Sequence, residues 1–195
     1  MNLDQIKQLV QASIDVKQKV LSNNSLLQTV AQVAEALVEA LKQDKKILFA
    51  GNGGSAADAQ HLSAELSGRF YHDRDPLFAE ALHVNTSYLT AVANDYSYDE
   101  VYARLVKAKG RNGDVLVGLS TSGNSRNILR ALETAKQQGM TTVGFTGETG
   151  GKMKVLCDFL VNVPSSDTPR IQESHILLGH IVCQLVEENL FKQGK

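Results

Sequence analysis

The order of elements along the chain constrains the fold more than any single residue does. A short apolar run is followed by glycine or serine and then by a segment with helical spacing, and this order recurs. Strands that read as near-continuous apolar runs and alternate with helices are typical of a parallel sheet covered on both faces. We therefore predict an α/β fold, a three-layer sandwich. The runs are residues 46–50 (KILFA), 114–120 (DVLVGLS), 141–147 (TTVGFTG), 158–164 (DFLVNVP) and, more weakly, 77–84 (LFAEALHV).

Residues 1–43 lack such runs and predict two helices. Ser25 and Gln28 form a capping-box pattern that marks the start of the second helix. Apolar stripes of this kind are typical of a core or of a contact between subunits. The first stripe is Leu3, Ile6, Val10 and Ile14, and the second is Leu26, Val30, Val33, Leu37 and Leu41.

The segment from Arg170 to Phe191 predicts one long final helix. Its middle, residues 176–186 (ILLGHIVCQLV), is apolar on nearly all sides. A helix with this pattern is normally buried.

Composition excludes some classes of partner. The chain has 195 residues, enough for one well-packed domain and short for two. A net charge of −1 provides no broad basic field for a nucleic acid or an anionic membrane. The first residues lack the layout of a signal peptide, and Cys157 and Cys183 predict free thiols in a reducing compartment. We expect a cytoplasmic protein with no nucleic-acid or membrane partner.

Two strand-end loops, residues 51–55 (GNGGS) and 120–125 (STSGNS), have the composition of a phosphate site. Glycines allow the backbone N–H groups to approach an anion, and the N-terminus of the following helix adds unpaired N–H donors. Neither loop has a Walker lysine or the G-x-G-x-x-G spacing, so a triphosphate or dinucleotide is disfavoured. Each loop alone is explained by tight turns and helix caps. Two of them at the ends of two parallel strands favour a compact phosphomonoester.

His61 and Glu65 follow the first loop and are four residues apart. In a helix they are separated by about 40° around the axis, so both project from one face. This is the geometry by which a helix offers two ligands to one zinc ion. The alternative is a solvated pair on a helix surface, which is common.

His180 lies in the apolar part of the final helix, where an imidazole requires a hydrogen-bond partner or a metal. A histidine satisfied within the core is the usual explanation. His175 is the weaker candidate, because it lies about 140° away around the helix. Gln172 is about 80° from the direction of His180, and Glu173 aligns better. Helix geometry does not choose between Gln172 and Glu173.

Together these motifs resemble the sugar isomerase (SIS) domain family and, within it, the phosphoheptose isomerases. The resemblance covers nearly the whole chain, with the motifs in the same order. They are residues 51–70 (GNGGSAADAQHLSAELSGRF), 92–95 (VAND), 120–125 (STSGNS), the pairs TG and GG at 146–147 and 150–151, and 170–180 (RIQESHILLGH).

The resemblance implies a five-stranded parallel sheet of the flavodoxin-like or Rossmann-like type. It implies a single SIS domain over residues 1–195, with residues 1–43 as a helical extension and 44–195 as the α/β core. It also implies a homotetramer with one Zn²⁺ per subunit. The implied activity is the aldose–ketose isomerisation of D-sedoheptulose 7-phosphate to D-glycero-D-manno-heptose 7-phosphate, the first step toward ADP-heptose.

The resemblance also implies roles for individual residues. Glu65 and His180 are the implied acid/base pair. The implied metal ligands are His61, Glu65, Gln172 and His180, so the family favours Gln172 over Glu173. The implied substrate contacts are Asn52, Gly53, Gly54, Ser55, Glu65, Asn94, Asp95, Ser120, Thr121, Ser122, Ser125 and Gln172.

Two further positions bear on the site. Arg69 lies just past the helix of His61 and Glu65 and is a further candidate for sugar or phosphate oxygens, with a solvated surface arginine as the alternative. Some family members have an aspartate directly before RIQE. Here that position is Pro169, and the nearest acid is Asp167.

Three other functions share the fold. One class of SIS protein binds the replication initiator DnaA without catalysis, and a second senses a phosphosugar without turning it over. The DnaA-binding relatives lack the full metal and acid/base set, whereas this chain has all four positions. Arabinose 5-phosphate isomerases usually have additional regulatory domains, for which this chain has no room.

Overall fold

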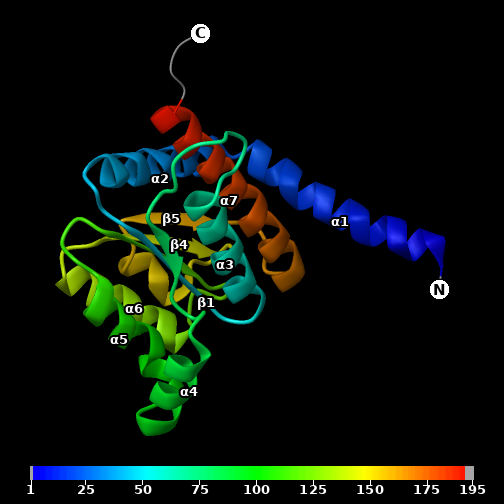
Figure 1. The fold of residues 1–195 in the computed structure, drawn as a ribbon. Helices are drawn as coiled ribbons and strands as arrows, with labels where there is room; N and C mark the ends of the chain where they lie inside the picture. Colours follow the sequence, from blue (N-terminus) through cyan, green and yellow to red (C-terminus); the bar gives the residue numbers. More distant parts are fainter. Residues whose placement is uncertain (1, 192–195) are drawn as a thin grey trace.

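The computed structural model describes residues 2–191, so the expected domain limits at residues 1 and 195 lie outside the described residues. The chain forms α-helices that surround a central sheet (Figure 1). In chain order the elements are α1 (Leu3–Leu21), α2 (Asn24–Lys42), β1 (Ile47–Gly51), α3 (Gly54–Ser67), β2 (Ala79–Ala81), α4 (Thr86–Asp95), the 3-10 helix η1 (Tyr98–Glu100), α5 (Val101–Lys109), β3 (Val115–Leu119), α6 (Arg126–Gln137), β4 (Thr141–Thr146), the 3-10 helix η2 (Gly151–Val155), β5 (Phe159–Asn162) and α7 (Thr168–Phe191).

The sheet confirms the predicted fold class. Within residues 2–191 it has five strands in the order β2-β1-β3-β4-β5, and every pair of neighbours is parallel. Each apolar run seen in the sequence forms one of these strands. The first strand, β1, lies between β2 and β3, one position from the edge of the sheet, and each parallel connection passes through helical segments.

The strands are buried on both faces and separate two cores. Phe49 and Val117 point toward the layer that contains α2, α3 and α7. Leu48 and Leu116, their neighbours in the chain, point toward the layer that contains α5 and α6. Because side chains alternate across a strand, an apolar run is required to fill both cores. The result is the predicted three-layer sandwich.

The two N-terminal helices form as predicted, but the cap of the second is different. Asn23, and not Ser25, is the N-cap of α2, and its side-chain oxygen accepts the N–H of Leu26 at 3.1 Å. The N–H of Asn23 donates in turn to the carbonyl of Val20, which makes the link between the helices short. The capping box predicted at Ser25 and Gln28 is therefore wrong, since both residues lie inside the helix.

Apolar residues of two helices remain at the surface of the chain. The stripe on α1 is outside the core, and α1 extends away from the body of the molecule (Figure 1). On α7, Leu177 and Ile181 are 36% and 37% exposed, so the prediction that the middle of this helix is wholly buried is wrong for this face. The exposed α1 residues are Leu3, Ile6, Leu9, Val10 and Ile14. Within residues 2–191, the structure contains no helix with the length and hydropathy of a membrane span.

Candidate active site

Two loops lie side by side at the carboxyl edge of the sheet. β1 ends at Gly51 and β3 ends at Leu119, and these residues are direct partners in the parallel ladder. One loop leads into α3 and the other into α6. The N-termini of two helices therefore follow neighbouring strand ends, which is the place where open α/β sheets bind ligands.

The first loop depends on glycine at its start. A Cβ at Gly51 would lie 2.2 Å from the carbonyl oxygen of Ser55, so a side chain there would prevent the turn. The N–H of Ser55 donates to the carbonyl of Asn52 at 3.0 Å, and Ser55 itself is buried. Gly53 and Gly54 are exposed. The loop therefore presents backbone rather than bulky side chains to a ligand.

The second loop presents hydroxyl groups. The hydroxyl oxygens of Ser120 and Ser125 are 2.9 Å apart, and Ser120 is buried. The N–H of Gly123 closes the turn on the carbonyl of Ser120 at 2.9 Å. Thr121 is partly exposed and Ser122 is exposed. The two outer hydroxyls are thus accessible, while the two inner ones hold the shape of the loop.

A pair of amides joins the two loops. The side-chain amide of Asn52 donates to Asn127 at 2.9 Å, and that of Asn127 donates to Asn52 at 2.8 Å. Asn127 is buried in the first turn of α6 and its amide oxygen also accepts the N–H of Ile128. Asn127 was not predicted from the sequence as a residue of the site. The signal was an amide residue beside Ile128, on the apolar side of an otherwise amphipathic helix.

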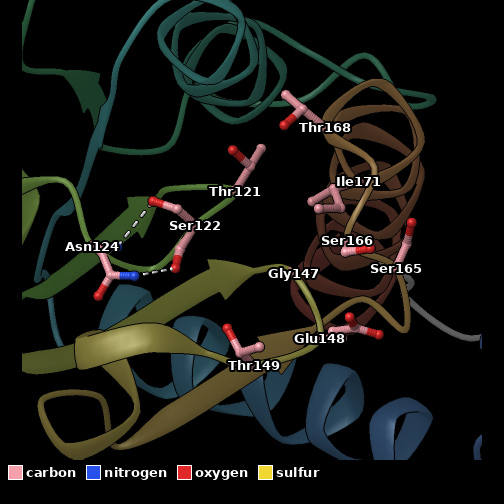
Figure 2. Close-up of a pocket in the computed structure, with 10 residues that line it drawn as sticks. All are labelled: Thr121, Ser122, Asn124, Gly147, Glu148, Thr149, Ser165, Ser166, Thr168 and Ile171. Carbon is pink, nitrogen blue, oxygen red and sulfur yellow. Dashed lines mark hydrogen bonds between the residues drawn. The ribbon is translucent and has the colours of Figure 1, made fainter.

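A cavity of about 290 Å³ lies between the ends of β3, β4 and β5 and the start of α7 (Figure 2). Among its lining residues, all within the described part of the chain, hydroxyl groups dominate and none is basic. Thr121 and Ser122 were predicted from the sequence, and Asn124 lies in the same predicted loop. The other lining residues follow β4 and β5 or belong to the start of α7, and they were missed. The lining is Thr121, Ser122, Asn124, Gly147, Glu148, Thr149, Ser165, Ser166, Thr168 and Ile171.

A second group of residues lies between α3 and α7. The Nε2 atom of His61 is 2.9 Å from Oε1 of Glu65 on the same helix. It is also 3.0 Å from Nε2 of His180 on α7, and His180 Nε2 is 4.0 Å from Glu65 Oε1. Residues that are 119 positions apart therefore meet. We call His61, Glu65 and His180 the α3–α7 cluster.

The donor atoms of the α3–α7 cluster fit a metal ion. All of them lie within 4.8 Å of one another. Ligands of tetrahedral Zn²⁺ lie about 2.0–2.2 Å from the ion, which separates them by about 3.3–3.6 Å. Two imidazoles and one carboxylate also match the chemistry that borderline divalent ions prefer. The cluster is therefore a candidate metal site, with His61 52% exposed and accessible from solvent.

The environment of His180 favours a neutral imidazole. Partial burial is the largest influence and lowers the pKa of His180, and His61 lowers it further, whereas Glu65 raises it. The ring of Phe70 packs against it, with ring centroids 5.6 Å apart and an interplanar angle of 31°. A neutral imidazole is the form that either accepts a proton or binds a metal.

Gly179 explains why the two helices approach so closely. A Cβ at this position would lie 2.6 Å from a methyl carbon of Leu62 on α3. The glycine precedes His180, so the closest approach of α7 to α3 falls beside the cluster. A larger residue would push the helices apart and separate His180 from His61.

The structure distinguishes Gln172 from Glu173. A Cβ at Gly54 would lie 2.4 Å from Nε2 of Gln172, so this side chain lies against the start of α3. Glu173 faces α1 instead: its carboxylate accepts the hydroxyl of Ser13 at 2.6 Å and lies 3.6 Å from Nζ of Lys17. Of the two residues that helix geometry left open, Gln172 is the one beside α3.

Three of the candidate substrate contacts lie apart from these groups. Arg69 is exposed just beyond the end of α3. Asn94 and Asp95 are exposed at the end of α4, where Asn94 donates to Asp95 at 3.0 Å. α4 packs against α5 and η1. Within residues 2–191, none of the three lines the cavity or belongs to the α3–α7 cluster.

His175 is a structural residue, in agreement with its weaker candidacy. It is fully buried, and its Nε2 lies 3.1 Å from the carbonyl of Thr146. Burial lowers its pKa to about 4, although the contact with Thr146 opposes the shift. Cys157 and Cys183 are free thiols whose pKa burial raises to about 12, which makes both unreactive.

Comparison with known proteins places this architecture among sugar phosphate enzymes. Residues 10–147 match the SIS domain family. The chain is 53% identical over 189 residues to a phosphoheptose isomerase of Aneurinibacillus thermoaerophilus, a match that covers 97% of this chain and 96% of the relative. The phosphoheptose isomerase structure from Neisseria gonorrhoeae superimposes with a TM-score of 0.89 at 44% identity, covering 95% of this chain and 98% of that one. The structure from Francisella tularensis gives 0.92 at 36% identity, with 96% and 100% coverage.

Proposed function

The chain belongs to the phosphoheptose isomerases of the SIS-domain family, and from this premise we propose that it converts D-sedoheptulose 7-phosphate to D-glycero-D-manno-heptose 7-phosphate. This aldose–ketose isomerisation would be the first step toward ADP-heptose. The observation that carries the proposal is that two imidazoles and a carboxylate from distant parts of the chain meet within 4.8 Å. A protein that only binds a phosphosugar requires no such group.

The reaction moves a proton between C1 and C2 of the sugar through a cis-enediol. It requires a base at carbon, an acid or base at the oxygens and stabilisation of the developing charge. We assign the carbon proton to the carboxylate of Glu65, which is 23% exposed and so accessible to a substrate. We assign proton movement at the sugar oxygens to His180, whose lowered pKa makes the neutral form available at pH 7.

The metal belongs to the same proposal. His61, Glu65 and His180 would hold one Zn²⁺ per chain, with Gln172 as the fourth ligand. When bound, the ion would act as a Lewis acid on the sugar carbonyl. A carboxylate that binds a metal is a weaker base, so Glu65 is the residue for which the two roles compete.

The phosphate would bind at the other end of the site. Ser120, Thr121, Ser122 and Ser125 offer hydroxyls at the start of α6, a helix whose N-terminal N–H groups attract anions. The loop of Asn52, Gly53, Gly54 and Ser55 would contact the sugar between the two ends, with Arg69, Asn94 and Asp95 as further substrate contacts. Remote binding of the phosphate would hold the reacting carbons in place.

A homotetramer and a cytoplasmic location complete the proposal. The exposed apolar stripe of α1, with Leu3 and Leu9 64% and 58% exposed, is costly in water and is covered if copies of the chain associate. The number four rests on the family resemblance, and native mass spectrometry tests it. Two free thiols are consistent with a reducing compartment. We also treat residues 1–195 as a single SIS domain.

One experiment separates the three candidate functions. The purified protein is incubated with sedoheptulose 7-phosphate, the product is followed by chromatography and the metal content is measured by mass spectrometry. Turnover with about one metal ion per chain supports the isomerase. Binding without turnover indicates a phosphosugar sensor, and the absence of both binding and turnover indicates a protein of the initiator-association type. Glu65→Gln controls for a contaminating isomerase.

A further inference from the structure

A buried ion pair lies outside the α3–α7 cluster and joins the two helices that form it. Arg74 belongs to the segment between α3 and β2, and Glu187 belongs to α7. Their side chains are 2% and 1% exposed, and Nε of Arg74 lies 3.0 Å from Oε1 of Glu187. Burial of two charges is costly unless further hydrogen bonds satisfy both groups. The partners of each residue therefore show what the pair holds.

Glu187 holds the segment that follows α3. Its carboxylate accepts three successive backbone N–H groups, from Phe70 at 3.1 Å, Tyr71 at 2.7 Å and His72 at 3.1 Å. Burial by itself would raise the pKa of Glu187, but these donors and Arg74 hold it below its usual range. The carboxylate is ionised at neutral pH and fixes the backbone of residues 70–72.

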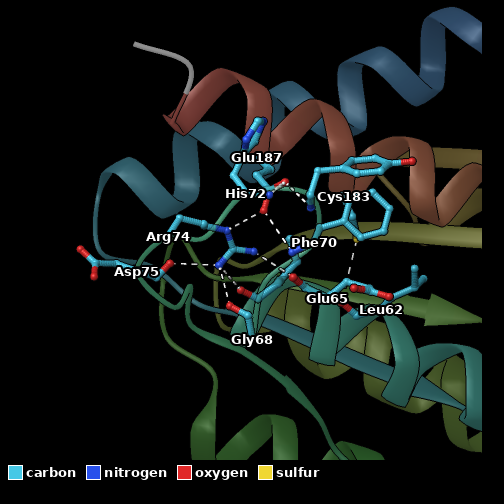
Figure 3. Close-up of polar contacts among 11 residues, drawn as sticks. Leu62, Glu65, Gly68, Phe70, His72, Arg74, Asp75, Cys183 and Glu187 are labelled. Carbon is cyan, nitrogen blue, oxygen red and sulfur yellow. Dashed lines mark hydrogen bonds and ion pairs between the residues drawn. The ribbon is translucent and has the colours of Figure 1, made fainter.

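Arg74 holds the end of α3. Its Nη2 donates to the carbonyl of Glu65 at 2.8 Å, and its Nη1 donates to those of Leu66 at 2.8 Å and Gly68 at 3.1 Å. These carbonyls belong to the last turn of the helix, where intrahelical partners are lacking. A cation at this end also matches the helix dipole. Figure 3 shows the guanidinium between Glu187 on one side and Glu65 and Gly68 on the other.

Both sides of this network contact the cluster. Arg74 bonds the backbone of Glu65 itself. Glu187 follows His180 by seven residues, which is two turns and the same face of α7. Phe70, whose N–H is held by Glu187, places its ring against the ring of His180. The pair therefore reaches Glu65 through one helix end and His180 through an aromatic contact.

We propose that Arg74 and Glu187 are positioning residues for the isomerase centre: they fix the end of α3 and the segment 70–72 so that Glu65 and His180 act on one bound substrate. This inference rests on the proposed function, which assigns the acid/base pair to Glu65 and His180. The competing explanation is a purely structural ion pair, which stabilises the fold and leaves turnover of the folded protein unchanged.

The test compares two variants of the pair with a matched control. Arg74→Lys keeps the charge but loses the planar fork, and Glu187→Gln keeps the shape but loses the charge. The control is Asp114→Asn. Asp114 is 1% exposed, lies 2.7 Å from Nζ of Lys46 and accepts the N–H groups of Lys46 and Arg111. It precedes β3, at the amino end of the sheet and away from the cluster.

Steady-state kinetics are measured well below each melting temperature, with the folded fraction determined by circular dichroism. We expect kcat of Arg74→Lys and Glu187→Gln to fall about 10- to 100-fold, the range for residues that orient an active group from outside. KM should change less than about threefold. Asp114→Asn should lose stability while kcat is retained. Unchanged kcat in the folded fraction of both pair variants would overturn the proposal.

A third variant and a second measurement keep the test decisive. If neither pair variant folds, Phe70→Leu leaves the ion pair in place and removes only the ring against His180. It should lower kcat several-fold, and an unchanged kcat would again contradict positioning. The metal-free protein is also titrated with Co²⁺ and followed by visible absorption, which reports the arrangement of the cluster ligands and does not require turnover. Weaker binding and an altered spectrum in Glu187→Gln, but not in Asp114→Asn, would support positioning even if the wild-type protein did not isomerise sedoheptulose 7-phosphate.

Discussion

The two ends of the candidate site differ in almost every physical property. The cavity at the ends of β3, β4 and β5 is lined mainly by hydroxyls from consecutive loops, and Glu148 is its one charged residue within the described chain. The α3–α7 cluster consists of titratable side chains from two helices that are more than a hundred residues apart. Neutral donors suit an anion that must be held, and titratable groups suit a proton that must move. In the proposed function, binding and chemistry are accordingly divided between the two ends.

The largest expected effect comes from the cluster. Glu65→Gln and His180→Gln are each expected to fold, to bind the sugar phosphate and to lose about 10²- to 10⁴-fold in kcat, the usual contribution of a general acid or base. Substrate affinity, measured by calorimetry, should stay close to that of the parent because the phosphate end is untouched. If both variants retained most of the activity, the assignment of proton transfer to the α3–α7 cluster would be wrong.

The next largest effect should come from the cavity, where substitutions should change KM more than kcat. Ser122→Ala and Thr121→Val each remove one accessible hydroxyl, and a hydrogen bond to a charged group contributes about 1.5–3 kcal/mol. We expect KM to rise about 10- to 100-fold, with a smaller change in kcat, in steady-state assays with sedoheptulose 7-phosphate. The control is Thr134→Val, because the Thr134 hydroxyl bonds within α6 to the carbonyl of Arg130. A fall in kcat with constant KM would contradict a binding role for this end.

The loops at the strand ends could be predicted from the sequence, whereas the meeting of α3 with α7 could not. The strands follow from local periodicity, and the place of both loops follows from the rule for parallel sheets, which the pairing of Gly51 with Leu119 confirms. His61 and Glu65 meet because helical spacing fixes residues four apart. Relations within one element, or between adjacent strand ends, are thus accessible from the sequence.

Contacts between distant elements are not accessible in this way. Asn127 meets Asn52 across 75 residues, and His180 meets His61 across 119, because the packing of whole helices brings them together. The apolar pattern of α7 also does not reveal which side faces the core, and Ile181 remains at the surface. The cap at Asn23 was missed because the chain turns sooner after α1 than the capping-box pattern suggested.

The smallest expected effect concerns two histidines of α7 that lie five positions apart. His180 is 36% exposed in the cluster, whereas His175 is fully buried beside Thr146 at the end of β4. Burial lowers the pKa of His175 to about 4, against an ordinary value of 6.5. The unfolded chain therefore binds a proton between pH 6.5 and pH 4 that the folded chain does not. The contribution of the neutral His175 imidazole to the free energy of unfolding is therefore fully present above pH 6.5 and is lost as the pH falls toward 4.

The measurement is the free energy of unfolding in urea at several pH values between 7 and 4.5. The contribution of His175 should approach a slope of about 1.4 kcal/mol per pH unit, one proton taken up on unfolding. His175→Gln has no titratable side chain at this position. It should be less stable at pH 7, and its free energy of unfolding should depend less steeply on pH than that of the parent. The control is Thr134→Val, which removes a hydroxyl bonded within α6 and no titratable group, and it should keep the slope of the parent. An equal slope in His175→Gln and the parent would mean that His175 binds its proton over the same pH range in the folded and unfolded chains. The buried histidine beside β4 would then titrate like an exposed one, and the contrast between His175 and the histidine of the cluster would be lost.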